Sequence, residues 1–239
     1  EERIGRAGQD RCVSISDLGA VPIDDSVRRN EAASGYQFHM VCDGHGYMMY
    51  RKEGRYLCRE TAVGHVVDYV KENFHKALLQ NENFPVDIKL ALRQTCRTID
   101  AGAKQFAIDL KSSLQGESFM YSDLKLEQGT TLVCAVVTPE SRIFIATVGD
   151  SMVRSYKDGE LVFTTVPHNI SCEGEVARIL GSGGTIACSC GVNTHSGCMK
   201  GCDRSLRVGG VSNVNTINGR STGQLAMTRA FGDWQLVNR

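Results

Sequence analysis

The most constraining feature of the sequence is a pair of long amphipathic segments that follow one another directly. The first runs from Tyr56 to about Leu79, and the second from Pro85 to Leu110, each with apolar residues recurring at helical spacing. A helix with one apolar face must bury that face against another element. Two such segments in succession therefore predict an antiparallel helix pair lying on a sheet.

Strand patterns stand on both sides of these segments. Residues 12–19 and 36–42 precede them and are rich in β-formers, whereas the polar residues 113–129 after them are expected to form a loop. Short β-runs follow that loop, and the last two are separated by Asp158-Gly159, a dipeptide typical of hairpins. The β-runs read TTLVCAVV, RIFIATVGD, MVRSYKDG and ELVFTTV.

The order of the elements indicates the fold class. After the β-runs, residues 171–181 predict a short helix with Ser171 as its N-cap. Strands, then helices, then strands again favour antiparallel sheets with helices packed outside, an α+β arrangement, over alternating βαβ units. Residues 1–239 are expected to form a single domain, with residues 182–223 as a glycine- and cysteine-rich, flap-like insertion.

Composition excludes several classes of protein. Lys+Arg and Asp+Glu are balanced at 27 each, so no global charge points to nucleic acid or to an anionic membrane. No apolar run approaches the roughly 20 residues that span a bilayer, and the start EERIGRAGQD does not resemble a signal peptide. We expect a monomer.

The 10 cysteines also bear on the compartment. Cys42, Cys96 and Cys134 lie within apolar segments, where a free thiol behaves as a small hydrophobic residue. A chain of this length can build a core without disulfides, so a reducing compartment, cytoplasmic or nuclear, is favoured.

Three aspartates stand beside glycines or at strand ends: Asp10 in AGQDR, Asp43 in VCDGHG and Asp150 in TVGDS. Mg²⁺ and Mn²⁺ prefer hard oxygen ligands, and a following glycine lets its own carbonyl approach the ion. His45, beside such a site, is a candidate general acid. Each piece alone has a simpler interpretation, because Asp-Gly is a common turn and a neighbouring histidine is often only hydrogen-bonded within it.

Taken together, these segments resemble the metal-dependent (type 2C) protein serine/threonine phosphatase family. The matching series, in the family's order, covers nearly all of the chain, from Ile4 to Trp234. It consists of AGQDR, VCDGHG, GTTLVCAVV, ATVGDS, GEVARILGSGGTI, TINGR and LAMTRAFGDW. The resemblance implies a four-layer αββα sandwich, two packed antiparallel sheets flanked by helices, with metal ions in a cleft at one end.

The resemblance also implies roles for particular residues. Asp43 would bridge two Mg²⁺ or Mn²⁺ ions, the Gly44 carbonyl would bind one of them, and Asp10 would lie in or just outside their ligand shell. Asp150 matches an acid of a third, weaker metal site. His45 would protonate the departing serine or threonine oxygen after direct attack by a water that bridges the ions.

The chain departs from the family pattern at both ends. Gly5 stands where the family places a phosphate-binding arginine, and we assign that role to the neighbouring Arg6 because a guanidinium can bind two phosphate oxygens. Gln9 stands where glutamate is common. The SDG and DN motifs that supply further metal-binding aspartates do not occur, and we expect the domain to be incomplete at its C-terminus.

A cysteine cluster lies inside the insertion. Cys188, Cys190, Cys198 and Cys202 offer ligands for a tetrahedral structural Zn²⁺, but the spacings C-x-C and C-x₃-C are less specific than C-x₂-C. A loop with free thiols, or disulfides formed on oxidation, is the favoured interpretation.

The leading hypothesis is therefore a phosphatase that acts on phosphoprotein substrates. The first alternative is a catalytically impaired pseudophosphatase that serves as a binding or regulatory module, favoured by Gln9, the displaced arginine and the missing acids. The second is a phosphatase-like domain regulated by a partner or by zinc through its insertion.

Overall fold

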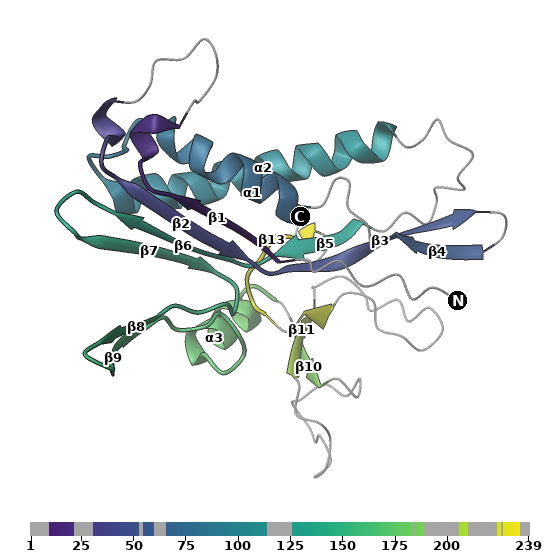
Figure 1. The fold of residues 1–239 in the computed structure, drawn as a ribbon. Coiled ribbons are helices and arrows are strands. Elements are labelled where there is room, and N and C mark those ends of the chain that lie inside the picture. The colour runs from purple at the N-terminus through teal and green to yellow at the C-terminus, as the bar shows by residue number, and fades with distance from the viewer. Residues whose placement is uncertain are drawn as a thin grey trace.

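The computed structural model describes most of the chain as an α+β fold (Figure 1). Its sheets are antiparallel throughout, which confirms the fold class expected from the order of the elements. The described residues are 10–21, 31–52, 55–59, 66–113, 126–183, 185–188, 206–209, 224–225 and 227–234.

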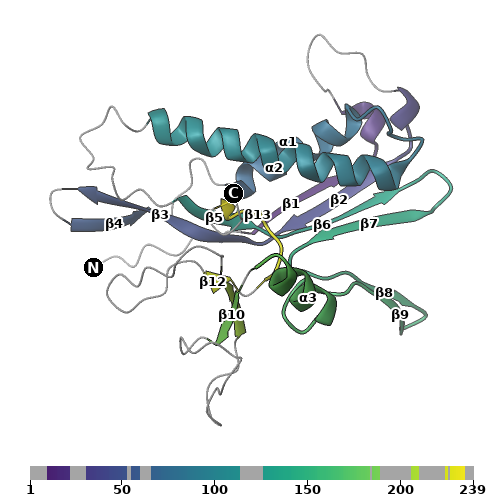
Figure 2. The same ribbon diagram turned by 180° about the vertical axis from the view of Figure 1, so that it is seen from behind.

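The first sheet is four-stranded and carries the core. Its order is β1-β2-β6-β7, and the helices α1 and α2 lie side by side over one of its faces (Figures 1 and 2). Alternate residues of β2 are buried beneath the helices, as the period of a strand requires. The bounds are β1 Arg11–Ile15, β2 Gln37–Cys42, β6 Leu132–Val137, β7 Ile143–Val148, α1 Val66–Leu79 and α2 Ile88–Ser113.

Aromatic side chains join the helices to this sheet. The ring of Phe74 on α1 stacks at 6.0 Å from that of Phe38 on β2 and meets Phe231 edge-on at 6.4 Å. Phe38 and Phe74 are fully buried and Phe231 nearly so. Phe231 belongs to the far C-terminal part of the chain, so its burial fixes that segment against the core formed by the N-terminal half.

The second sheet, also four-stranded, has the order β13-β5-β3-β4. Its central strand β5 is flanked by β3 on one side and by the very short β13 on the other. The bounds are β3 Gly44–Lys52, β4 Arg55–Arg59, β5 Leu126–Thr130 and β13 Phe231–Gly232.

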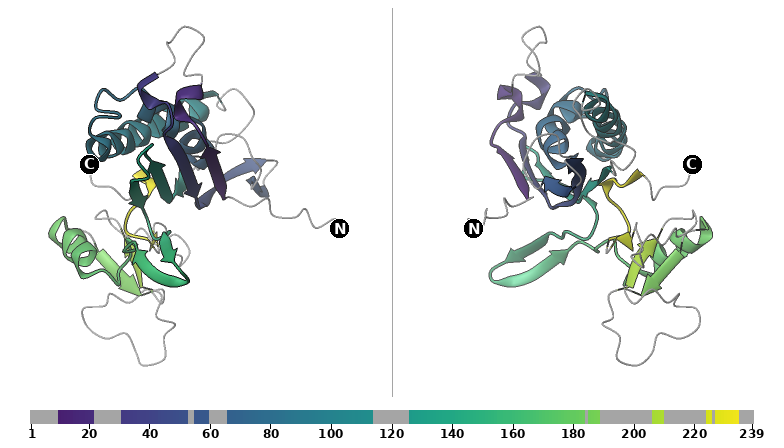
Figure 3. Two further views of the ribbon diagram at one scale, coloured as in Figure 1. Left: turned by 60° about the vertical axis from the view of Figure 1, so that its left-hand side comes forward. Right: turned by 90° about the vertical axis from the view of Figure 1, so that its right-hand side faces the viewer.

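The hairpin β8–β9, the helix α3 and the strands β10, β11 and β12 lie on the other side of the two sheets from α1 and α2 (Figure 3). The hairpin β8–β9 turns at Asp158 and Gly159, which have φ of +52° and +84°, as the Asp-Gly signal predicts. β10 and β11 pair within the cysteine- and glycine-rich segment. The bounds are β8 Arg154–Lys157, β9 Glu160–Thr164, α3 Glu173–Gly181, β10 Thr185–Cys188, β11 Leu206–Gly209 and β12 Gln224–Leu225.

Four expectations about local structure were wrong. Residues 18 and 19, expected to end the first strand, belong to the 3-10 helix Leu18–Ala20 instead. Residues 56–59, expected within the first helix, belong to β4, because pairing of Lys52 with Arg55 continues β3 into a hairpin. The expected loop at 113–129 contains most of β5, whose polar residues are ordered by strands on both sides. The N-cap of α3 is Cys172 rather than Ser171, and its side chain makes no capping hydrogen bond.

The expectation of free cysteine thiols in the core agrees with the structure, whereas the layering of the sheets remains a prediction. Five described cysteines, among them Cys42, Cys96 and Cys134, carry free thiols. Burial raises the pKa of Cys42 to about 12 and that of Cys96 to about 11, so these thiols stay protonated core groups. None of the described helices is long and apolar enough to cross a membrane. The stacking of two sheets into four layers remains a prediction.

Candidate functional site

The two main sheets meet at a corner where two strands pass from one sheet into the other. Asp43 alone separates β2 from β3, and Thr131 alone separates β5 from β6. The Thr131 N–H donates to the Asp43 carbonyl over 3.0 Å, and the Asp43 N–H donates to Thr131 Oγ1 over 3.2 Å. The backbone of Asp43 is thus held from the opposite strand, while the residue itself is exposed.

The turn after β7 packs against the same corner. Gly149 has φ of +100°, and a Cβ there would come within 2.6 Å of Thr131 Cγ2, so only glycine fits. The hydroxyl groups of Ser151 and Thr131 are hydrogen-bonded at 2.7 Å. These contacts bring Asp150, between Gly149 and Ser151, to the corner.

Strand pairing brings the third acid to the corner. Arg11 of β1 pairs with Cys42 of β2, so Asp10 lies opposite Asp43. Although Asp43 is exposed overall, partial loss of water around its carboxyl raises the pKa of that group. The charge of Asp10, a hydrogen bond with Asp10 and the charge of Asp150 raise the pKa further, while the charge of His45 lowers it. Carboxyl groups that crowd one another in this way favour retention of a proton.

A divalent cation is the natural counter-charge for such a group of acids. Mg²⁺ is commonly held by one or two carboxylates and keeps several waters, so Asp10 and Asp43 offer suitable hard oxygen donors. Among the residues that the structure describes, no group of three or more His, Cys, Asp or Glu side chains is arranged to hold a metal ion. Carboxylate oxygens are suitable ligands for Mg²⁺ or Mn²⁺, but the described acids alone do not form a complete set of ligands for such an ion.

The histidine of the DGHG motif has an acidic partner from the end of the chain. His45 Nε2 lies 2.6 Å from Asp233 Oδ2, and their side chains are 20% and 6% exposed. This pair brings together β3 and the residue directly after β13.

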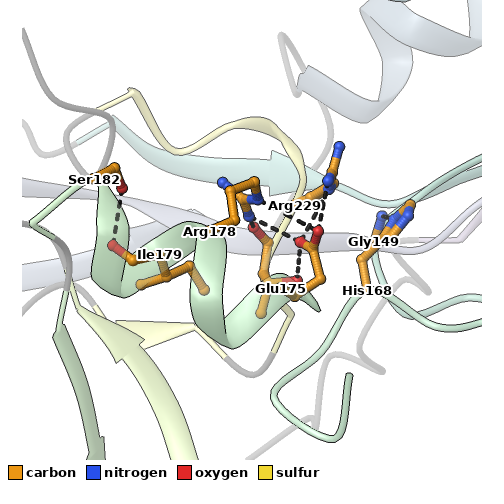
Figure 4. Close-up of polar contacts among 8 residues, drawn as sticks. Gly149, His168, Glu175, Arg178, Ile179, Ser182 and Arg229 are labelled. Carbon is orange, nitrogen blue, oxygen red and sulfur yellow. Dashed lines mark hydrogen bonds and ion pairs between the residues drawn. The ribbon is translucent and has the colours of Figure 1, made fainter. Parts of the chain in front are cut away.

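A second buried acid anchors the segment that leads to β13 (Figure 4). The side chain of Glu175, on α3, is only 6% exposed and accepts hydrogen bonds from both Arg178 and Arg229 and from the Thr228 hydroxyl. Burial alone would raise the pKa of Glu175, but these hydrogen bonds outweigh it and hold the pKa well below its usual range.

His168 connects this anchor to the turn at the corner. Its Nδ1 accepts a hydrogen bond from the Gly149 N–H at 3.2 Å, and its carbonyl accepts one from the Thr228 N–H at 2.8 Å. Burial, followed by the charge of Arg229, lowers the pKa of His168, which favours the neutral ring that the Gly149 contact needs. This geometry gives His168 a structural role, because it links the turn at Gly149 to the segment at Thr228.

The structure brings four of the expected site residues to one corner, namely Asp10, Asp43, Asp150 and His45, with Gly44 buried between two of them. Arg6, Cys190, Cys198 and Cys202 lie outside the described residues, and Cys188 ends β10 without a described side chain. Their roles stay predictions.

Sequence reasoning missed Thr131, Glu175 and Asp233. For Asp233 a signal was visible, since LAMTRAFGDW ends the resemblance with a glycine-aspartate pair. For Thr131 and Glu175 the contacts depend on segments far apart in the chain. No local pattern marks either residue.

Among solved structures, the fold is similar to "Structure of a C.elegans sex determining protein", with a TM-score of 0.53 at 17% identity. That match covers 97% of this chain and 46% of the other, and it bears on the fold alone. A family model described as "Protein phosphatase 2C" matches residues 23–194, more than half of the chain. The chain therefore belongs to the protein phosphatase 2C family.

Curated relatives agree with this assignment. "Probable protein phosphatase 2C 57" of Oryza sativa subsp. japonica is 26% identical over 199 residues, covering 83% of this chain and 38% of the relative. "Probable protein phosphatase 2C 76" of Arabidopsis thaliana is 28% identical over 169 residues, covering 71% and 30%. The chain thus spans less than half the length of these relatives.

Proposed function

We propose that the protein is a metal-dependent protein serine/threonine phosphatase whose reaction takes place at the corner between the two sheets. The observation that carries the proposal is the meeting of Asp10, Asp43, Asp150 and His45, which come from three separate parts of the chain. Family membership supports phosphoprotein substrates and the use of Mg²⁺ or Mn²⁺.

In this proposal the crowded acids hold the cations. Asp43 and Asp10 would supply carboxylate ligands, the Gly44 carbonyl a further oxygen, and Asp150 a ligand for an additional, weaker ion. When bound, such ions lower the pKa of a water and place positive charge opposite the phosphoryl oxygens. The raised pKa of Asp43 supports this role, because a bound cation would offset the loss of hydration and the charges of Asp10 and Asp150 that raise it.

The chain's own groups supply binding and proton transfer. Arg6 would orient the phosphoryl group through paired hydrogen bonds. His45 would give a proton to the serine or threonine oxygen as its bond to phosphorus breaks, since an alkoxide is a poor leaving group. The hydrogen bonds from the Thr131 N–H to the Asp43 carbonyl and from the Asp43 N–H to Thr131 Oγ1 would hold Asp43 in place during the reaction.

A pseudophosphatase that binds partners without hydrolysing them is the second candidate. The observation that favours it is that the described residues do not assemble three or more metal-binding side chains. In that case the corner would keep its geometry for recognition of phosphorylated segments rather than for their hydrolysis.

The deciding experiment measures Mn²⁺-dependent release of phosphate from a phosphothreonine peptide by the full-length protein. We expect activity that requires the metal and is lost in Asp43→Asn. The matched control is Asp158→Asn, an exposed aspartate in the β8–β9 turn, which should keep full activity. A folded protein that binds the peptide but releases no phosphate at any Mn²⁺ concentration would establish the pseudophosphatase instead.

A further inference from the structure

The turn that carries Asp150 is held on both sides of that residue. On one side, Gly149 is hydrogen-bonded to His168. On the other side, the Ser151 hydroxyl is hydrogen-bonded to the Thr131 hydroxyl at 2.7 Å. The place of the Asp150 carboxylate at the corner therefore depends on what holds its two neighbours.

His168 binds Gly149 through both of its backbone groups. The Gly149 N–H donates to His168 Nδ1 at 3.2 Å, and the His168 N–H donates to the Gly149 carbonyl at 2.9 Å. Because a peptide group is planar, the first bond orients the plane that joins Val148 to Gly149, and the second orients the plane that joins Gly149 to Asp150. One residue thus orients the backbone that leads directly into Asp150.

Gly149 needs such a clamp because glycine has the freest backbone of all residues. Its place is narrow: a Cβ there would lie 2.6 Å from Thr131 Cγ2 and 3.2 Å from the Arg229 carbonyl oxygen. The narrow space excludes other residues, but it does not by itself fix the rotation of the glycine backbone. The two hydrogen bonds with His168 supply that restriction.

Thr131 relates the same turn to Asp43. Its Oγ1 accepts a hydrogen bond from the Asp43 N–H at 3.2 Å and is also bonded to the Ser151 hydroxyl. One hydroxyl group therefore contacts both the residue that carries the Asp43 carboxylate and the residue directly after Asp150. The two acids are held relative to each other by Thr131 on one side of Asp150 and by His168 on the other.

His168 is itself supported by the anchor on α3 (Figure 4). Its carbonyl accepts a hydrogen bond from the Thr228 N–H at 2.8 Å. The Thr228 hydroxyl donates to Glu175 at 2.7 Å, and the Thr228 carbonyl accepts from Arg178 at 2.9 Å. Thr228 is thus bound through three of its polar groups, and it gives His168 a fixed base from which to hold Gly149.

We propose that His168 is the positioning residue of Asp150: by holding both backbone groups of Gly149, it keeps the Asp150 carboxylate in place for the additional cation. The inference rests on the part of the proposed function that gives Asp150 a cation. His168 acts on that site only through Gly149 and not as a ligand. Changes to groups that orient metal ligands typically weaken metal binding 10- to 100-fold, and we expect about 10-fold because His168 acts through the backbone.

The test measures Mn²⁺ binding by the full-length protein without substrate, from the decrease in the electron paramagnetic resonance signal of free Mn²⁺. Asp150→Asn identifies the class of binding that depends on Asp150. For His168→Ala we expect the affinity of that class to fall about 10-fold, while the affinity of the tighter class changes less than about twofold. His168→Asn, whose Oδ1 can replace Nδ1 as the acceptor, should recover most of the lost affinity.

The matched control is His39→Ala, because His39 Nδ1 is also hydrogen-bonded, to Ser14 Oγ at 2.9 Å, at an exposed position on β1 and β2. This variant should bind Mn²⁺ as the wild type does. An Asp150-dependent class that is unchanged in His168→Ala would refute the positioning role. An equal loss of affinity in both classes, or a His168→Asn variant no better than His168→Ala, would refute it too, because a general loss of structure would then explain the result.

Two further measurements test the link itself. In an Asp150→Asn background, His168→Ala should not weaken Mn²⁺ binding further, and an additional loss would overturn the inference. In the metal-free protein, hydrogen exchange of the Gly149 amide should be about 10-fold faster in His168→Ala than in His168→Asn, and equal rates would contradict the clamp.

Failure of the inference and failure of the proposed function are distinguishable. A wild type without an Asp150-dependent class would overturn both the inference and the cation role of Asp150. A wild type that has this class but releases no phosphate from the phosphothreonine peptide would refute the proposed catalysis alone.

Discussion

The buried carboxylate of Glu175 offers the sharpest test of how the C-terminal segment is held. Glu175→Gln keeps the shape of the side chain but removes its charge and replaces one accepting oxygen with an NH2 group, so Arg178 and Arg229 lose their shared carboxylate. Hydrogen bonds to charged groups contribute about 1.5–3 kcal/mol each. The two arginines are 44% and 46% exposed, and water replaces part of what they lose.

We therefore expect the variant to lower the free energy of unfolding by about 2–3 kcal/mol near neutral pH. For a chain of this size that corresponds to a fall in Tm of about 4–12 °C. The assay is urea denaturation followed by circular dichroism, with thermal melting beside it. Glu173→Gln is the matched control, because Glu173 lies in the same first turn of α3 but is exposed, and it should change stability by less than about 0.5 kcal/mol.

The pH dependence gives a second, independent readout. Folding lowers the pKa of Glu175 from its ordinary value of 4.5, so its contribution is fully present above that value and is lost as the pH falls toward the folded-state pKa. Glutamine does not titrate, so the difference in free energy of unfolding between the wild type and Glu175→Gln should become smaller below pH 4.5. A gap under about 0.5 kcal/mol near neutral pH, or one that stays constant into acid, would refute the reasoning.

Three more outcomes can be checked directly. Phe74→Ala should lower the free energy of unfolding, measured by urea denaturation, by about 3–5 kcal/mol, because the ring is fully buried between Phe38 and Phe231. A decrease of less than about 1 kcal/mol would contradict this packing. Iodoacetamide in mildly alkaline buffer should label the exposed Cys12 and spare Cys134, whose pKa burial raises well above its ordinary value, as peptide mass spectrometry would detect. His168→Ala should lower the free energy of unfolding by about 1 kcal/mol, because the hydrogen bond from the Gly149 N–H is lost. Because folding lowers the pKa of His168, that cost should be complete above pH 6.5 and shrink below it, and a cost that grows in acid would contradict the Gly149 contact.

Local patterns predicted the parts of the fold that depend on nearby residues. The spacing of apolar residues indicated α2 to within a few positions, and Asp158-Gly159 indicated the β8–β9 turn because both residues adopt positive φ there. The same reasoning failed for β4 and β5. Their strand conformation comes from pairing with β3, and residues 55–59 and 126–130 carry no strong period of their own.

In the candidate site too, the sequence predicted the residues that lie in short motifs and missed the contacts between distant parts of the chain. Asp10, Asp43 and Asp150 were found through motifs, each of which is a short run of adjacent residues. The contact between His45 and Asp233 joins residues 188 positions apart and depends on the absence of a side chain at Gly129. A single sequence contains no signal that a glycine on one strand makes room for a pair on its two neighbours.

The corner at Asp43 and Thr131 also restricts how the sequence can change. Side chains alternate between the two faces of a strand. Insertion of one residue beside Asp43 or Thr131 would therefore turn every following side chain of that strand to the opposite face. In β6 such a shift would turn Leu132, Cys134 and Val136 out of the core. The one-residue connections at Asp43 and Thr131 therefore fix which side chains of each strand face the core. A change of one residue in their length would damage both the core and the acid cluster.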